Sequence, residues 1–266
     1  MSILEKIVAT TKERVDREKK AGLLPQIRAN SNLNIRDSGC PATPFIFEKT
    51  LKESGFHFIC EVKKASPSKG VIDENFPYLD IAREYEQAGA AAISVLTEPD
   101  FFQGSDAYLS QIRKAVCTPL LRKDFTIDPF QIEQAAYLGA DAVLLICAIL
   151  TPTQLSEYIK KADSFGLSCL FEVHDEYELG LALKAGARII GVNNRDLKTF
   201  TVDTGISIRI RKLVPDEIVF VSESGIHAAE DISILKQNGI NSVLVGEALM
   251  RSPDKSAALQ NLRSLI

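Results

Sequence analysis

The sequence predicts a closed barrel of eight parallel strands, each followed by a helix: a (β/α)8 or TIM barrel, in the α/β class, with an N-terminal helical extension. One observation is a pattern that occurs four times, as QAGAAAISVL, YLGADAVLLI, KAGARIIGVN and QNGINSVLVG. Each copy ends a helix, places a glycine in the left-handed position after it, and continues as a β-branched apolar run. The other observation is spacing, since Gly89, Gly139, Gly186 and Gly239 lie 47 to 53 residues apart. A βα unit needs about 25 to 30 residues, so each interval holds two units.

The remaining four strands are expected between the copies of this pattern. The candidate segments are HFICEVK (57–63), PLLRKDF (119–125), LSCLFEVH (167–174) and EIVFVSES (217–224). Helical patterns separate the strands, for example YLDIAREYEQAG, DPFQIEQAAYLG, TPTQLSEYIKKADSFG and HAAEDISILKQNG. Strand–helix alternation predicts a parallel sheet, and eight units favour its closure. The alternative is an open doubly wound sheet, which lacks support because no G-x-G-x-x-G follows the first strand.

Residues 1–45 are expected to form an N-terminal helix and a connector ahead of the first strand. We expect this helix to cover one mouth of the barrel, and a part in lining a substrate site is the secondary interpretation. The segment RANSNLNIRDSGCPATPF is polar and rich in turn residues, as connectors are. The whole chain, 1–266, is predicted to be one barrel domain. The apolar stripe of the helix, at helical spacing, consists of Ile3, Leu4, Ile7, Val8, Thr11 and Val15.

Composition excludes several classes of partner. The net charge of −4 shows no basic excess, so neither a nucleic-acid nor a membrane partner is expected. No apolar run approaches the ~18 residues of a membrane span, and charges such as Glu5, Lys6 and Lys12 interrupt the stretch where a signal peptide would be apolar. We therefore expect a cytoplasmic protein.

The cysteines and histidines indicate neither a disulfide framework nor a metal site. The cysteines are odd in number and widely spaced, so we interpret them as reduced core residues. The three histidines have no HExxH or CxxC nearby, and no metal is expected. The cysteines in question are Cys40, Cys60, Cys117, Cys147 and Cys169.

Polar residues gather where the predicted strands end, the edge that carries catalytic groups in such barrels. Glutamates and lysines come from the first, third, fifth and seventh strands. Interior layers are built from alternate strands, so these groups should converge at similar height. The alternative is a structural ion-pair cluster, but buried charges often add nothing to stability over apolar residues, and the cluster therefore favours function. The residues are Glu61 and Lys63, Lys123, Glu172, Asn193 and Arg195, and Glu223.

A phosphate site is predicted after the seventh and eighth strands. Ser224-Gly225 and Gly246 each follow a strand and precede a helical pattern. Glycines let backbone N–H groups approach an anion, and loops at this position of the fold often hold phosphate. Each glycine alone could equally serve an ordinary turn. Ser66, Ser68 and Lys69, after the first strand, could close over a ligand or form a solvated turn.

Other charged residues are given no function. His174 is interpreted as a surface or capping residue, and Arg122 as a partner on the outer side of the barrel. Glu157, Lys160 and Lys161 are interpreted as a solvated helix face.

Six segments together resemble a known family. EVKKASPSKG, LRKDF, LFEVH, GVNNRDL, SESGI and LVGEALM occur in the order and spacing of indole-3-glycerol-phosphate synthases, and the resemblance runs from the N-terminal helix to about Met250. It implies a (β/α)8 barrel of tryptophan biosynthesis that acts without a cofactor. The implied reaction converts the phosphosugar 1-(2-carboxyphenylamino)-1-deoxyribulose 5-phosphate to indole-3-glycerol phosphate, carbon dioxide and water. Other tryptophan-pathway enzymes are candidate protein partners.

The resemblance also implies catalytic roles for matching residues. Lys123 resembles the general acid that protonates the substrate carbonyl, with Glu172 as its partner in acid/base work. Glu61 and Lys63 would assist ring closure and dehydration, and Glu223 belongs to the same cluster.

The same comparison implies the substrate contacts. Asn193 and Arg195 would position the hydroxyls and the benzoate carboxylate, with Lys63 as a second candidate for the carboxylate. Glu247 departs from the family pattern, because many relatives have serine beside the phosphate. The expected phosphate contacts are Ser66, Ser224, Gly225 and Gly246, and those expected to pack the anthranilate ring are Phe102, Phe125 and Leu144.

Two other functions stay open from sequence. One is another sugar-phosphate barrel enzyme, such as phosphoribosylanthranilate isomerase, although Glu61-x-Lys63 with Lys123 is not its usual set. The other is a non-catalytic phosphosugar-binding relative, against which the intact acid, base and phosphate positions argue.

Overall fold

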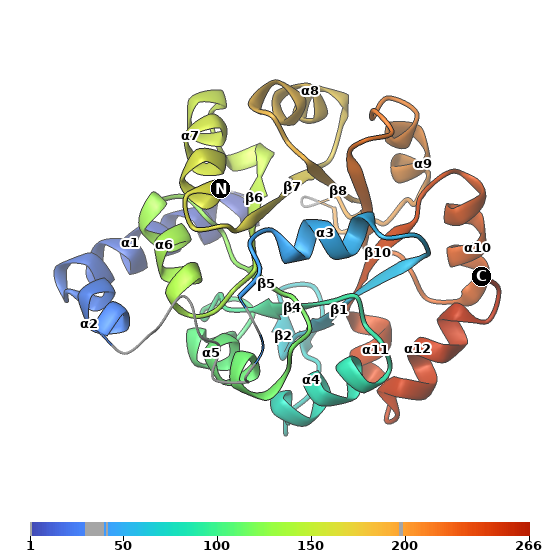
Figure 1. Ribbon diagram of the computed structural model, residues 1–266, viewed down its shortest axis with the longest axis horizontal. Helices are drawn as coiled ribbons and strands as arrows, with labels where there is room; N and C mark the ends of the chain where they lie inside the picture. Colours follow the sequence, from blue (N-terminus) through green and yellow to red (C-terminus); the bar gives the residue numbers. More distant parts are fainter. Residues whose placement is uncertain (1, 30–39, 41, 197–198) are drawn as a thin grey trace.

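The computed structural model describes residues 2–29, 40, 42–196 and 199–266 and contains the closed eight-stranded barrel that the sequence predicts (Figure 1). All neighbouring barrel strands are parallel, and the ring order is β1-β10-β9-β8-β7-β6-β5-β4. The strands are β1 His57–Val62, β4 Ala92–Leu96, β5 Leu120–Lys123, β6 Ala142–Ile146, β7 Ser168–Val173, β8 Ile189–Asn193, β9 Val219–Glu223 and β10 Ser242–Val245.

A ring of helices surrounds the barrel (Figure 1). Their starts follow ordinary capping chemistry: Asp128 caps a helix with Pro129 in its first turn, and Thr151 forms a capping box with Gln154. The helices are α4 Tyr78–Gln87, α5 Asp106–Ala115, α6 Pro129–Tyr137, α7 Pro152–Asp163, α8 Glu176–Ala185, α9 Gly205–Arg211, α10 Ala229–Gln237, α11 Glu247–Arg251 and α12 Lys255–Arg263, with a 3-10 turn η1 at Cys147–Ile149.

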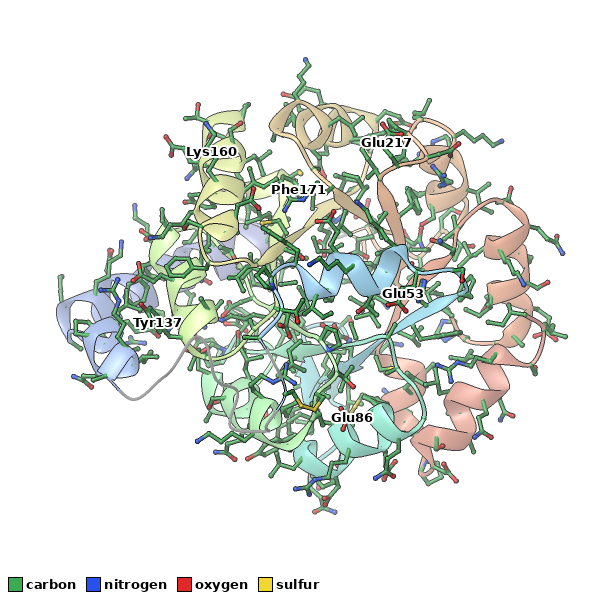
Figure 2. All side chains as sticks on the ribbon, viewed as in Figure 1. Glu53, Glu86, Tyr137, Lys160, Phe171 and Glu217 are labelled. Carbon is green, nitrogen blue, oxygen red and sulfur yellow. A yellow bond between two sulfur atoms is a disulfide. The ribbon has the colours of Figure 1, made fainter. Side chains whose placement is uncertain are left out.

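Strand alternation separates two apolar cores. On β7, Phe171 (labelled in Figure 2) and Val173 belong to the core between strands and helices. Leu170 belongs to the second core, inside the barrel, and Glu172 points to the same side as Leu170. The strand is buried on both faces, which is why it is apolar on both faces apart from its ends.

A short helix that the sequence analysis did not predict closes the bottom of the barrel. This helix, α3 (Ile46–Lys52), crosses the centre of the ring in Figure 1. Phe47 and Leu51 are fully buried in the core inside the barrel, and the Glu48 backbone N–H donates to the Ser168 hydroxyl at the start of β7. The opposite end, where the strands finish, is left open for a site.

The N-terminal extension has more helix than expected. Helix α1 (Ile3–Lys20) confirms the predicted stripe, and α2 (Leu23–Ala29) follows it. Most of the predicted connector lies outside the described residues. The buried Arg14 guanidinium donates to Asp124 at 2.8 Å and so ties α1 to the end of β5. Of the two interpretations of this helix, the structure supports the secondary one, because residues of α1 line the cavity described below.

The expectation of five reduced cysteines is wrong for one pair. Cys40 and Cys117 form a disulfide, with their Cα atoms 5.8 Å apart, whereas Cys60, Cys147 and Cys169 are free and buried. Cys117 lies in the exposed turn between α5 and β5. A contact between residues 77 positions apart leaves no local pattern in sequence.

None of the helices in the described ranges has the length and hydropathy needed to cross a bilayer. Nor do three or more His, Cys, Asp or Glu side chains come together there in a way that could hold a metal ion.

Candidate active site

A cavity of about 170 Å³ lies where the barrel strands end. A cavity needs about 10 to 15 Å³ of this kind of volume to hold one water molecule, so this cavity has room for a small organic ligand. Every residue that the sequence analysis proposed for catalysis or substrate binding lies along its wall. Their roles stay predictions, but their convergence on one space is a property of the fold.

Lys123, Glu172 and Glu223 form the centre of the cavity wall. The Lys123 Nζ lies 3.2 Å from the Glu172 Oε2 and 3.9 Å from the Glu223 Oε2. Both carboxyl groups are buried, with 2% of each residue exposed. They come from β5, β7 and β9, which are alternate strands of the barrel, as the layer argument predicts.

This arrangement separates the protonation states of the carboxyl groups. Burial on its own would lower the pKa of Lys123, but Glu172, Glu223 and Glu61 outweigh it and raise the pKa above the ordinary value. Burial also works against the charge on Glu172, yet Lys123 and His174 bring its pKa below the usual range. Burial raises the pKa of Glu223 to about 8, because Lys123 offsets only part of it and Glu172 and Glu61 add repulsion. Near neutral pH one carboxyl is therefore ionised and the other mostly protonated.

Glu61 and Lys63 form an ion pair at the end of β1, where side chains two residues apart point to the same face. A Cβ at Gly246, after β10, would collide with the Glu61 carboxylate and the Lys63 amine. Gly246 therefore allows the backbone after β10 to approach the pair. The sequence analysis assigned this glycine only to phosphate binding.

Asn193 links the ends of β8 and β9. Its Oδ1 accepts hydrogen bonds from the Ser224 hydroxyl at 2.9 Å and the Arg195 backbone N–H at 3.1 Å, and its side chain contributes to the lowered pKa of Glu172. Ser224 has a φ of 68°, a conformation that a non-glycine residue rarely adopts without cause. The strained turn aims the Ser224 hydroxyl at Asn193.

The loop after β1 and the start of α11 meet at the cavity rim. This loop forms a hairpin that the sequence analysis did not predict, from β2 (Ala65–Ser66) and β3 (Gly70–Val71). At its tip the Lys69 Nζ lies 3.5 Å from the Glu247 Oε1, and Arg251 donates to the same oxygen at 3.0 Å. Burial opposes ionisation of Glu247, but Arg251 and Lys69 lower its pKa. Its charge is thus balanced by two cations.

Aromatic and apolar side chains also line the cavity. The rings of Phe102 and Phe125 lie 6.2 Å apart, and Leu144 of β6 lines the same cavity. The buried Glu98 carboxylate accepts the backbone N–H groups of 100–102, two of them on one oxygen at 2.7 and 3.0 Å, and so fixes the loop that carries Phe102.

Ile3, Leu4 and Ile7 of α1 line the cavity, in agreement with the secondary interpretation of the N-terminal helix. Two further contributors were missed from sequence, and one of them is Phe200, which also lines the cavity. Gly191, inside β8, faces the barrel interior, and a Cβ there would collide with a Glu223 carboxylate oxygen. A glycine within a strand is a signal of close approach that could have identified it.

Two residues given no function occupy defined places. Arg122 is buried on the outer side of β5 and donates to Asp106 at 2.8 Å, as expected. His174 is not a surface residue: its side chain is 18% exposed, and its Nε2 lies 3.6 Å from the Glu172 Oε1. His174 lies two residues after Glu172, and this spacing brings its ring beside the Glu172 carboxylate at the end of the strand.

Comparison with solved structures supports the fold alone. The chain is similar to 3-hexulose-6-phosphate synthase from Salmonella typhimurium, with a TM-score of 0.64, 15% identity, and coverage of 79% of this chain and 97% of that one. It is also similar to KGPDC from Streptococcus mutans, with a TM-score of 0.62, 11% identity, and coverage of 79% and 97%.

Comparison of sequences is far more specific. The chain is 58% identical over 261 residues to an indole-3-glycerol phosphate synthase of Ruminiclostridium cellulolyticum, covering 98% of each chain. It is 52% identical over 262 residues to that of Endomicrobium trichonymphae, covering 98% of this chain and 99% of the relative. The family model for indole-3-glycerol phosphate synthase matches residues 4–262. On these grounds, and with the predicted residues around one cavity, the chain belongs to the indole-3-glycerol phosphate synthase family.

Proposed function

We propose that this chain converts 1-(2-carboxyphenylamino)-1-deoxyribulose 5-phosphate to indole-3-glycerol phosphate, carbon dioxide and water, with Lys123 as the general acid. Membership of the family, a family of carboxy-lyases of tryptophan biosynthesis, supports the reaction. The observation that carries the residue assignment is the Lys123 ammonium, held 3.2 Å from Glu172 at the centre of the cavity.

Ring closure is the first step. The ring carbon that bears the carboxylate attacks the ketone carbon, and the ketone oxygen takes a proton to become a hydroxyl. A donor at that oxygen lowers the barrier, and Lys123 is a charged donor on the cavity wall. The carbon–carboxylate bond then breaks, and its electrons flow into the iminium-like intermediate. Carbon dioxide leaves and the aromatic ring is restored.

Dehydration is the second step and needs both an acid and a base. The hydroxyl leaves as water after protonation, and a neighbouring carbon gives up a proton. The lowered pKa of Glu172 suits a base, and the raised pKa of Glu223, about 8, suits a group that holds a proton near neutral pH. Glu61 and Lys63 assist at the adjacent strand end.

The substrate would lie across the cavity. Ser66, Ser224, Gly225 and Gly246 hold the phosphate on the side of β1, β9 and β10, and Arg195, Asn193 and Lys63 hold the hydroxyls and the carboxylate. Phe102, Phe125 and Leu144 pack the aromatic ring, since aromatic and apolar faces suit a flat apolar group. All of these residues line one cavity, which supports this orientation of the substrate.

Three wider assignments rest on family membership. Residues 1–266 form one domain with 1–45 as its extension. The protein works in the cytoplasm, and other enzymes of the tryptophan pathway are its candidate partners. Size-exclusion chromatography with the neighbouring pathway enzymes would detect the last of these.

The experiment is a turnover assay with the carboxyphenylamino substrate that measures both indole fluorescence and released carbon dioxide. The wild type should release both products, and Glu172→Gln should lower kcat by about 10² to 10⁴ because it removes the base. Glu157→Gln, on the exposed face of α7, is the matched control and should behave as wild type. Wild-type turnover without carbon dioxide would favour an isomerase, tight binding without turnover would favour a non-catalytic relative, and an unimpaired Glu172→Gln would refute the assignment of the base.

A further inference from the structure

His174 lies between two carboxylates, and the reaction above gives it no role. It follows β7 directly, and its Nδ1 is 3.0 Å from the Oε2 of Glu178, in the first turn of α8. The same Glu178 oxygen accepts the His174 backbone N–H at 2.9 Å. The Nε2, on the other side of the ring, is 3.6 Å from the Glu172 Oε1. That nitrogen is buried and has no hydrogen-bond partner within the described ranges.

The two contacts determine where the protons of the ring must be. The Glu178 carboxylate can only accept at Nδ1, so Nδ1 carries a proton. In the neutral ring the Nε2 would then turn a lone pair toward the Glu172 oxygen, and two electron-rich atoms would face each other. In the imidazolium an N–H points at that oxygen instead. The geometry therefore favours the doubly protonated ring.

The charges around the ring act in the same direction. Burial would lower the pKa of His174, but the hydrogen bond to Glu178 and the charges of Glu172 and Glu223 raise it. These carboxyl groups face the ring from α8, β7 and β9. In η1, burial raises the pKa of the Cys147 thiol, so it stays uncharged. The two carboxylates in contact with the ring, Glu178 and Glu172, therefore both favour the imidazolium.

Glu172 is then held at both oxygens. Lys123 is 3.2 Å from Oε2, and His174 is 3.6 Å from Oε1. Resting on the function proposed above, we propose that His174, anchored by Glu178, is a positioning residue that keeps the Glu172 carboxylate in place and ionised for proton transfer. It acts through Glu172 and does not touch the substrate.

The first test is the pH profile of kcat. In His174→Gln the acidic limb should move to higher pH by about one unit, since a cation within 4 to 6 Å shifts a carboxyl group by one or more. KM should stay within about twofold at pH 7.5, because substrate contacts are unchanged. Glu178→Gln, which leaves the ring without its charged anchor, should move the limb in the same direction. Glu176→Gln is the matched control, because Glu176 lies in the same turn of α8 but pairs with Arg209 at 2.7 Å. It should leave the acidic limb unchanged.

A purely structural role would lower the amount of active protein equally at every pH. An acidic limb of His174→Gln that coincides with that of the wild type therefore overturns the proposal. An inactive wild type would instead refute the function proposed above.

The second test needs no variant that folds poorly. The chain has three histidines, and the titration of the ring signals by NMR in the wild type separates them. The His174 ring should titrate above the ordinary value of ~6.5. Titration below that value would overturn the proposal even if His174→Gln failed to fold.

Discussion

The sharpest test of the site is the removal of the Lys123 ammonium. In Lys123→Ala the proton donor at the centre of the cavity is lost, and so is the cation 3.2 Å from Glu172 and 3.9 Å from Glu223. General acid catalysis contributes about 10² to 10⁴ in rate, which corresponds to about 3 to 5 kcal/mol of barrier. We therefore expect kcat to fall at least ~100-fold, with a smaller change in KM because Lys123 contributes mainly in the transition state.

The loss of the cation has a second effect on the two carboxyl groups. Without Lys123, the repulsion between Glu172 and Glu223 is uncompensated and burial still opposes ionisation, so the pKa of Glu172 should rise. The acidic limb of any residual activity should therefore move to higher pH. Uptake of a proton by Glu172 also limits the loss of folding stability in the variant. Lys123→Met, which keeps the buried methylene stem, is a second variant with the same change of charge.

The assay follows indole fluorescence at several pH values, with circular dichroism to verify the fold. Lys160→Ala, on the exposed face of α7 (Figure 2), is the control for loss of one lysine and should keep wild-type kcat. If the cluster were only a structural ion-pair plug, Lys123→Ala would change the free energy of unfolding and leave kcat unchanged. Near wild-type turnover in a folded Lys123→Ala would therefore refute the reasoning.

Three further predictions concern stability and the phosphate end. Phe47→Ala should lower the free energy of unfolding by about 3 to 5 kcal/mol in urea titrations, because Phe47 is fully buried. It should leave KM unchanged, because Phe47 lies at the end of the barrel away from the cavity. A loss of less than ~1 kcal/mol would contradict this prediction. Glu247→Ser should lower KM roughly fivefold, about 1 kcal/mol, because Lys69 and Arg251 become free to attract the phosphate; a raised KM would show that Glu247 aids binding. The third prediction is a pH effect, because folding raises the pKa of Glu223 from ~4.3 to about 8. The contribution of Glu223 to the free energy of unfolding is therefore fully present below pH ~4 and is lost as pH rises to about 8. Glu223→Gln should therefore gain stability relative to wild type between pH ~6 and ~8, and a constant difference across that range would rule out the raised pKa.

Much of the site was predictable because its residues stand at strand ends. The period-2 alternation of LSCLFEVH places Glu172 on the inner face, and the same reasoning holds for Glu223 and Lys123. In a parallel barrel the strand ends form one rim, so residues far apart in sequence must meet there. The register that the structure shows, such as Asn193 opposite Glu223, agrees with that expectation.

Other features left only weak local traces. Helix α3 is seven residues long, too short for a clear period, although it buries Phe47 in the barrel. His174 was misjudged because its position after the strand suggests solvent, whereas α8 brings Glu178 against it. The pairing of Cys40 with Cys117 depends on the path of the N-terminal connector.

By itself, the sequence determined the eight βα units, the inward face of each strand and the set of polar residues at the rim, because capping, glycine turns and alternation act over a few residues. Only the tertiary structure decided that Lys123 pairs with Glu172, that Gly191 and Gly246 admit the carboxylates of Glu223 and Glu61, and that α1 lines the cavity. These contacts depend on how strands and helices distant in sequence are tilted and packed against one another, and distances of a few ångströms across a barrel are set by that packing.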